Sequence, residues 1–154
     1  MVDVMYVASA GGHLSELLEL EPLFKKHSKV IITEKTESTL KLKEKYDLKY
    51  VAYGSKQYMY KYIFIFPYNI IKAMYYILKY RPKVIITTGA HTGGIFVTVG
   101  KILGKKTIYI ESMAKVDSLS QTGKFVYNKV DKFYVQWEDL CKKYDKCKYL
   151  GRLK

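Results

Sequence analysis

The stretch Lys83–Gly94, KVIITTGAHTGG, decides the fold. It starts with a short β-branched run, Lys83–Thr88, whose apolar centre suits a parallel strand covered on both faces. A glycine-rich turn, Gly89–Gly94, follows, and a small apolar helix is expected from about Thr92 to Leu103. A buried strand, a glycine turn and a helix in this order are typical of an α/β protein.

The same alternation of strand and helix extends in both directions from this stretch. Further strands are expected at Val2–Ala8, Lys29–Thr33, Lys49–Tyr53, Lys105–Glu111 and Lys132–Gln136, with Lys148–Leu150 as a seventh strand or a tail. Further helices are expected at Leu14–Lys26 (ended or kinked by Pro22), around Thr36–Tyr46, at Tyr58–Tyr80, near Lys124–Asn128 and at Trp137–Lys143. We therefore predict one Rossmann-like domain over residues 1–154: an open, mostly parallel sheet of about six or seven strands with helices on both faces.

The segment Tyr58–Tyr80 is broadly apolar and aromatic, but lysines interrupt it. Its uncharged run is about half the roughly 20 residues that a membrane-spanning helix needs. On a helix, Lys61, Lys72 and Lys79 fall within roughly 20° of one another. We predict that this helix lies in a membrane surface through Lys61, Phe64, Phe66, Lys72 and Lys79, without spanning it. A core helix with one solvated face is the alternative, and Pro67 predicts a kink or two shorter segments.

Charge supports an anionic partner. The net charge is +13, and no acidic residue occurs between Asp47 and Glu111, where ten lysines and arginines fall. Because this basic excess coincides with the apolar helix, it fits an anionic membrane better than a nucleic acid. No signal peptide precedes the first strand, so we expect membrane contact from the cytoplasmic side. Cys141 and Cys147 are expected to be reduced thiols, and no metal-ligand spacing is present.

Polar and glycine-rich loops follow three of the expected strands, where α/β sheets bind ligands. Gly11 and Gly12 suit a phosphate cradle or a tight turn, and the pattern matches no dinucleotide or ATP fingerprint. His13 either contacts phosphate, acts as a base, or caps its own helix. Candidate contacts in the later loops are Gly89, His91, Thr92, Gly93, Gly94 and Ser112.

Glu111 ends a strand and is a candidate base or sugar ligand, with a structural salt bridge as the alternative. For Gly89, Gly93 and Gly94, the alternative to ligand binding is that they allow close packing of the helix on the sheet. Gln136 and Trp137 follow another strand and are assigned to a partner interface, with core packing as the alternative for Trp137.

Four motifs in order resemble a known family: SAGGHLSELLEL, TTGAHTGG, IESMAK with SQTGK behind it, and FYVQW. The chain resembles the PssD/EpsE/CpsF-type polysaccharide-biosynthesis proteins, bacterial counterparts of the asparagine-linked-glycosylation membrane-anchor subunit, protein fourteen. The resemblance implies the N-terminal half of a MurG-type GT-B glycosyltransferase. It also implies a separate catalytic subunit that holds most of the UDP-sugar site, and a polyprenyl-diphosphate-linked sugar as acceptor.

By this resemblance, Gly11, Gly12 and His13 face the acceptor diphosphate, Gly89–Gly94 forms a second acceptor loop, and Glu111 lies at the sugar. We therefore expect a peripheral subunit at the cytoplasmic face of the plasma membrane, inactive alone, with no tightly bound cofactor and no nucleic-acid partner. A basic nucleic-acid-binding protein and a self-sufficient nucleotide-dependent enzyme are the alternatives.

Overall fold

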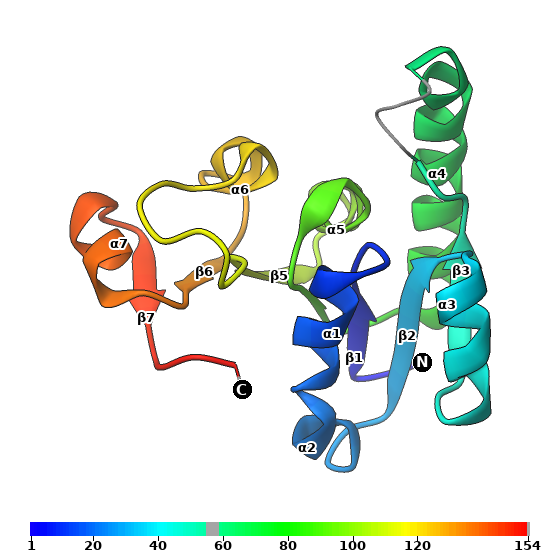
Figure 1. Ribbon diagram of the computed structural model, residues 1–154. Coiled ribbons are helices and arrows are strands. Elements are labelled where there is room, and N and C mark those ends of the chain that lie inside the picture. The colour runs from blue at the N-terminus through cyan, green and yellow to red at the C-terminus, as the bar shows by residue number, and fades with distance from the viewer. Residues whose placement is uncertain (55–58, 154) are drawn as a thin grey trace.

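A computed structural model describes residues 1–54 and 59–153 and the side chains of all of these except 59–61. Seven strands form one parallel sheet in the order β3-β2-β1-β4-β5-β6-β7 (Figure 1). They are β1 (Val4–Val7), β2 (Lys29–Glu34), β3 (Leu48–Val51), β4 (Val84–Thr87), β5 (Lys106–Ile110), β6 (Lys132–Val135) and β7 (Cys147–Tyr149). The Rossmann-like fold is confirmed, and the segment expected as a strand or a tail is an edge strand.

Two hydrophobic cores lie on the two faces of the sheet. One is built with α1 (Gly12–Leu18), α2 (Glu21–Phe24) and the short helix η1 (Leu42–Glu44), which directly follows α3 (Glu37–Lys41). The other is built with α4 (Met59–Tyr80), α5 (Ala90–Ile102), α6 (Gln121–Val126) and α7 (Glu138–Lys143). Strands β1 and β4 are neighbours, with Val7 opposite Thr87. The chain therefore winds outward in both directions from this pair, which makes their carboxyl ends the topological switch point.

The structure shows how two of the predicted helices accommodate a proline. The expected Leu14–Lys26 helix is divided into α1 and α2, and Pro22 lies in the first turn of α2, where a missing N–H costs nothing. By contrast, α4 continues through Pro67 as one helix, so the predicted alternative of two shorter segments is wrong. Pro67 and Ile63, whose carbonyl loses its helical partner, both lie on the exposed face, where water can replace the lost hydrogen bond. Tyr58, the expected first residue of this helix, lies outside the described residues.

The β4 strand is less evenly covered than its apolar sequence predicted. Ile85 and Thr87 are fully buried beneath α5, whereas Ile86 on the opposite face is half-buried. A cavity of about 300 Å³ runs beside Ile86, Ile108 and Tyr134, and the segment Leu150–Leu153 lines its far side. The reason is topological, because the helices that follow β4 in the described chain pack on the other face.

Candidate functional site

The loop after β1 brings exposed backbone to the switch point. Gly11 caps α1 with φ of 87°, a left-handed conformation that favours glycine. No heavy atom lies within 4 Å of a Cβ built at Gly11 or Gly12, so both face open space. Gly12, by contrast, does not have a positive φ.

The loop after β4 lies beside the first loop and is more tightly packed. Gly89 caps α5 with φ of 102°, and a Cβ there would lie 2.9 Å from the Tyr109 hydroxyl. Gly93 is buried, and a Cβ there would lie 2.0 Å from Thr87 Oγ1. Gly94 is similarly pressed against Thr122. The geometry of Gly93 and Gly94 therefore supports the packing alternative for these two glycines.

His13 connects the two loops. Its Nδ1 lies 2.9 Å from the carbonyl oxygen of Thr88, and the Thr88 hydroxyl donates to the carbonyl of His13 over 2.6 Å. Because a carbonyl only accepts hydrogen bonds, Nδ1 carries a proton in this contact. In the neutral ring, Nε2 then holds the lone pair that can accept a proton, which is the arrangement a general base needs.

Glu111 follows β5 and is fully buried. Its carboxylate accepts hydrogen bonds from the backbone N–H groups of Ser112 and Ser120, both over 3.0 Å, and from the Ser120 hydroxyl over 3.1 Å. Burial raises the pKa of Glu111, while these hydrogen bonds and the nearby His13 act in the opposite direction. Glu111 thus organises the loop between β5 and α6.

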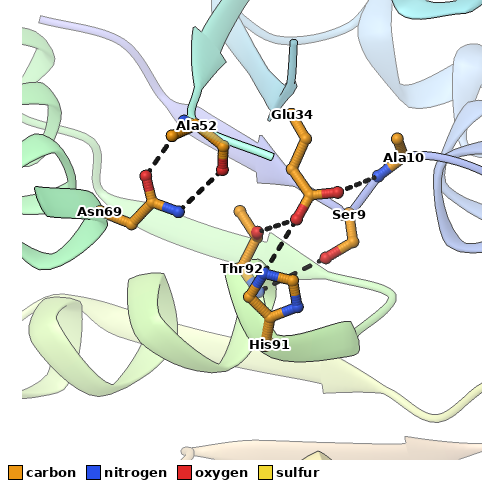
Figure 2. A network of polar contacts seen from close by, with 7 residues as sticks. All are labelled: Ser9, Ala10, Glu34, Ala52, Asn69, His91 and Thr92. Atoms are coloured by element: carbon orange, nitrogen blue, oxygen red, sulfur yellow. Dashed lines mark hydrogen bonds and ion pairs between the residues drawn. The ribbon is translucent and has the colours of Figure 1, made fainter. Parts of the chain in front are cut away.

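The sequence analysis missed Glu34, the last residue of β2, which is 1% exposed. Figure 2 shows its carboxylate between the two glycine loops. Oε2 accepts a hydrogen bond from the Ala10 N–H over 3.1 Å, and Oε1 accepts one from the Thr92 hydroxyl over 2.8 Å. His91 Nε2 is 3.0 Å from Oε1, within ion-pair distance although the two atoms are not aligned for a hydrogen bond. The sequence did carry a signal for Glu34, because it lies at the carboxyl end of a strand. The same kind of position made Glu111 a candidate.

Glu16 was also missed, because a glutamate on a helix usually faces solvent. Its Oε1 accepts hydrogen bonds from the Ser112 hydroxyl over 2.9 Å and from the Met113 N–H over 3.1 Å. Its Oε2 accepts a hydrogen bond from Gln136 Nε2 over 3.3 Å. Helix α1 is thereby tied to the loop after β5 and to the end of β6.

The two residues assigned to a partner interface are held within the chain. Gln136 is 2% exposed, donates to the Glu111 carbonyl over 3.1 Å, and accepts from the Leu153 N–H over 2.9 Å. The half-buried Trp137 donates from Nε1 to the Met113 carbonyl over 2.7 Å, and the Arg152 guanidinium lies 3.8 Å from the ring centroid. Both residues anchor the segment after β7, so a partner would meet them through that segment.

The exposed face of α4 is apolar along its length. Its exposed large side chains are Ile63, Phe64, Phe66, Tyr68, Ile71, Met74, Tyr75 and Leu78. Two lysines lie beside tyrosines on this helix: Lys72 Nζ lies 5.7 Å from the centroid of the Tyr68 ring, and Lys79 Nζ donates to the Tyr75 hydroxyl over 3.1 Å. The side chain of Lys61 lies outside the described residues. Figure 1 shows the first turns of α4 projecting beyond the ends of the strands.

The structure describes residues 1–54 and 59–153, and two further statements hold for this part of the chain. Within that part of the chain, no helix has both the length and the apolarity that crossing a membrane requires. Over the same residues, no three His, Cys, Asp or Glu side chains gather as metal ligands would. Cys141 and Cys147 are free thiols, and burial raises the pKa of Cys147 to about 12.

The fold and the paired glycine loops define the N-terminal half of a GT-B protein. The crystal structure of Acinetobacter baumannii MurG matches with a TM-score of 0.75 and 11% identity, over 99% of this chain and 46% of that one. A glycosyltransferase from Rickettsia africae matches with a TM-score of 0.66 and 18% identity, over 97% of this chain and 42% of that one. These likenesses show the fold.

A family model described as "Oligosaccharide biosynthesis protein Alg14 like" matches residues 4–153, and the chain belongs to that family. The UDP-N-acetylglucosamine transferase subunit alg14 of Schizosaccharomyces pombe is 44% identical over 75 residues, which span 46% of this chain and 36% of that protein. The rat subunit ALG14 is 28% identical over 99% of this chain and 83% of its own length. The resemblance based on the four motifs is thereby confirmed.

Proposed function

We propose that this chain is the acceptor-side, membrane-associated subunit of a two-component UDP-sugar glycosyltransferase. The observation that carries this proposal is the family match over residues 4–153, whose relatives are named as UDP-N-acetylglucosamine transferase subunits. Those names favour UDP-N-acetylglucosamine as the donor. We extend the proposal to a polyprenyl-diphosphate-linked sugar as acceptor and to the biosynthesis of a capsule or exopolysaccharide, on the motif resemblance.

A separate catalytic subunit is the expected partner. The described fold corresponds to 46% of Acinetobacter baumannii MurG, which is about one half of a GT-B enzyme. The half-covered face of β4, β5 and β6 supports this, because Ile86, Ile108 and Tyr134 leave an apolar surface beside the segment Leu150–Leu153. In this proposal the partner meets Gln136 and Trp137 through that segment.

The acceptor is proposed to lie at the switch point, with its diphosphate between the open backbone of Gly11 and Gly12 and the start of α5. An acceptor hydroxyl oxygen attacks the anomeric carbon of the donor sugar, the bond from that carbon to UDP breaks, and UDP leaves. The hydroxyl proton passes to a base. His13 is the candidate because its Nδ1–H is engaged by Thr88, which leaves Nε2 to take the proton. Glu111 then serves by holding the neighbouring loop.

Attachment to an anionic membrane from its cytoplasmic face completes the proposal. It is supported by the exposed apolar face of α4, by Lys72 and Lys79 along that face, and by the net charge of +13. A nucleic-acid partner would explain the charge but leave the exposed apolar side chains without a purpose.

The test is sugar transfer from radiolabelled UDP-N-acetylglucosamine to a polyprenyl-diphosphate-linked acceptor sugar. The assay is run with this chain alone, with a candidate catalytic subunit alone, and with both. We expect transfer only when both are present. Full activity of this chain alone would make it a self-sufficient enzyme and overturn the proposal.

A further inference from the structure

An apolar groove of about 490 Å³ lies between α4, α5 and α6. Its walls and floor are built by Tyr62, Phe66 and Ile70 of α4, by Ile95, Val99 and Ile102 of α5, and by Phe125 of α6. Such a volume is within the range of small-molecule pockets, roughly 300–1,000 Å³. A site for a helix from a partner protein would have to be broader than this groove, because a helix with its side chains is about 10 Å across.

The two ends of the groove differ in polarity. His91, Gln121 and Thr122 line one end, at the starts of α5 and α6, on the edge of the sheet that carries the glycine loops. Ile102 lies at the other end of α5, about 16 Å further along the helix axis, and it is 79% exposed. The groove therefore leads from a polar mouth near the switch point to an apolar exit.

Charge along the groove favours an anionic amphiphile. Among its described lining residues there is no carboxylate, and Lys129 lies with its ammonium 3.0 Å from the centroid of the Phe125 ring. Two carboxylates lie beside the polar mouth, Glu34 next to His91 and Glu111 next to the first turn of α6, and both are buried and already accept hydrogen bonds from the chain. An anionic head group at the mouth thus meets histidine, amide and hydroxyl groups.

We propose that this groove holds the first part of one isoprenoid chain, with the diphosphate to which the chain is attached at the polar mouth. The inference rests on the proposed function, because it assigns a place to the lipid of the proposed acceptor. The groove is continuous through Phe66 with the exposed apolar face of α4, so the remainder of a long chain can pass directly into a bilayer. Binding of the lipid chain and attachment to the membrane are then separate tasks of neighbouring surfaces.

The experiment measures binding of soluble probes by isothermal titration calorimetry, without vesicles or a partner. The probes are farnesyl diphosphate, inorganic diphosphate and farnesol. We expect farnesyl diphosphate to bind at least ~10-fold more tightly than inorganic diphosphate, because its chain buries apolar surface. Equal affinities of these two would overturn the groove, and farnesol binding as tightly as farnesyl diphosphate would overturn the polar mouth as the site of the diphosphate.

Two groove variants and one matched control make the test specific. Phe125→Glu and Ile102→Glu place a carboxylate in the groove at side chains that are 58% and 79% exposed, so folding is expected to survive. Each should reduce the affinity for farnesyl diphosphate to that for inorganic diphosphate. Phe64→Glu, on the exposed face of α4 outside the groove, should leave farnesyl diphosphate binding unchanged. Unchanged binding by both groove variants would contradict the proposal.

The result of the binding experiment can be separated from that of the transfer assay, because binding is measured without sugar transfer. Tight farnesyl diphosphate binding that is lost in the groove variants would support the groove even if the reconstituted pair transferred no sugar. Conversely, the pair could transfer sugar while farnesyl diphosphate and inorganic diphosphate bind equally well. That result would overturn the proposal that the groove holds the lipid chain and would support the proposed function. Circular dichroism of each variant shows whether it is folded.

Discussion

His91 Nε2 lies 3.0 Å from Glu34 Oε1, so the first turn of α5 is attached to the carboxyl end of β2 across the intervening strand β1. The same carboxylate accepts the Ala10 N–H from the loop after β1 (Figure 2). Glu34 thus sets the position of both glycine loops relative to each other, although it has almost no contact with solvent. The ring of Tyr62 packs against His91 at 5.7 Å between centroids, which extends this arrangement to α4.

Replacing Glu34 should loosen the site. In Glu34→Ala, the Ala10 N–H and the Thr92 hydroxyl lose their acceptor, and each unsatisfied buried group costs about 1–3 kcal/mol. We expect a lower free energy of unfolding in urea and weaker sugar transfer by the reconstituted pair. Glu37→Gln, at an exposed position on α3, is the control and should change neither. Stability of Glu34→Ala within about 0.5 kcal/mol of wild type would contradict this role.

Asn69 should be a second sensitive position. It is fully buried in α4, accepts a hydrogen bond from the Ala52 N–H over 3.1 Å, and donates to the Ala52 carbonyl over 2.9 Å. Asn69→Ala leaves both backbone groups without these partners, which should destabilise the fold by about 2–4 kcal/mol in urea unfolding. Ile71→Ala, on the exposed side of the same helix, should cost much less. Equal effects of the two would mean that the Asn69 bonds contribute little.

Burial of Glu111 predicts a particular dependence on pH. Its pKa is raised in the folded state, so above the ordinary value of 4.5 the unfolded chain releases a proton that the folded chain retains. The contribution of Glu111 to stability is therefore fully present below that pH and is lost as the pH rises through the raised folded pKa. We expect the free energy of unfolding of wild type relative to Glu111→Gln to fall over this range. A relative stability that increases with pH would show that hydrogen bonding, and not burial, dominates.

Membrane attachment is tested by reversing charge on α4. The triple variant Lys61→Glu, Lys72→Glu and Lys79→Glu should stop the protein from floating with anionic vesicles, because each lysine near such a surface contributes about 1 kcal/mol. A control that makes the same change in net charge, at the exposed Lys25, Lys26 and Lys43 on the opposite face of the sheet, should still float. Equal loss in both variants would indicate a general charge effect, and retention by the α4 variant would remove the membrane assignment.

The alternation of strands and helices, and the edge of the sheet that carries the glycine loops, were predictable from local pattern, whereas the contacts between those loops were not. Runs such as Lys83–Thr88 specify a parallel strand through their own composition. Glu34 accepts a hydrogen bond from Thr92, 58 residues away, and Glu16 accepts one from Ser112, 96 residues away. No local pattern reports such pairings. Pro67 shows the same limit, because its effect depends on which face of α4 meets solvent.

His13 is the residue on which the proposed chemistry depends most directly. Its Nδ1–H contact with Thr88 orients the ring, so His13→Ala should lower sugar transfer by the reconstituted pair about 10²–10⁴-fold if Nε2 takes the acceptor proton. Binding between the two subunits, measured by co-purification, should be unchanged because the partner surface proposed at Gln136 is supported by Glu16 and Leu153. His27→Ala, at an exposed position after α2, should have no effect on either measurement. Full transfer by His13→Ala would limit His13 to a structural role, whereas loss of both transfer and co-purification would show that it supports the fold on which the partner docks.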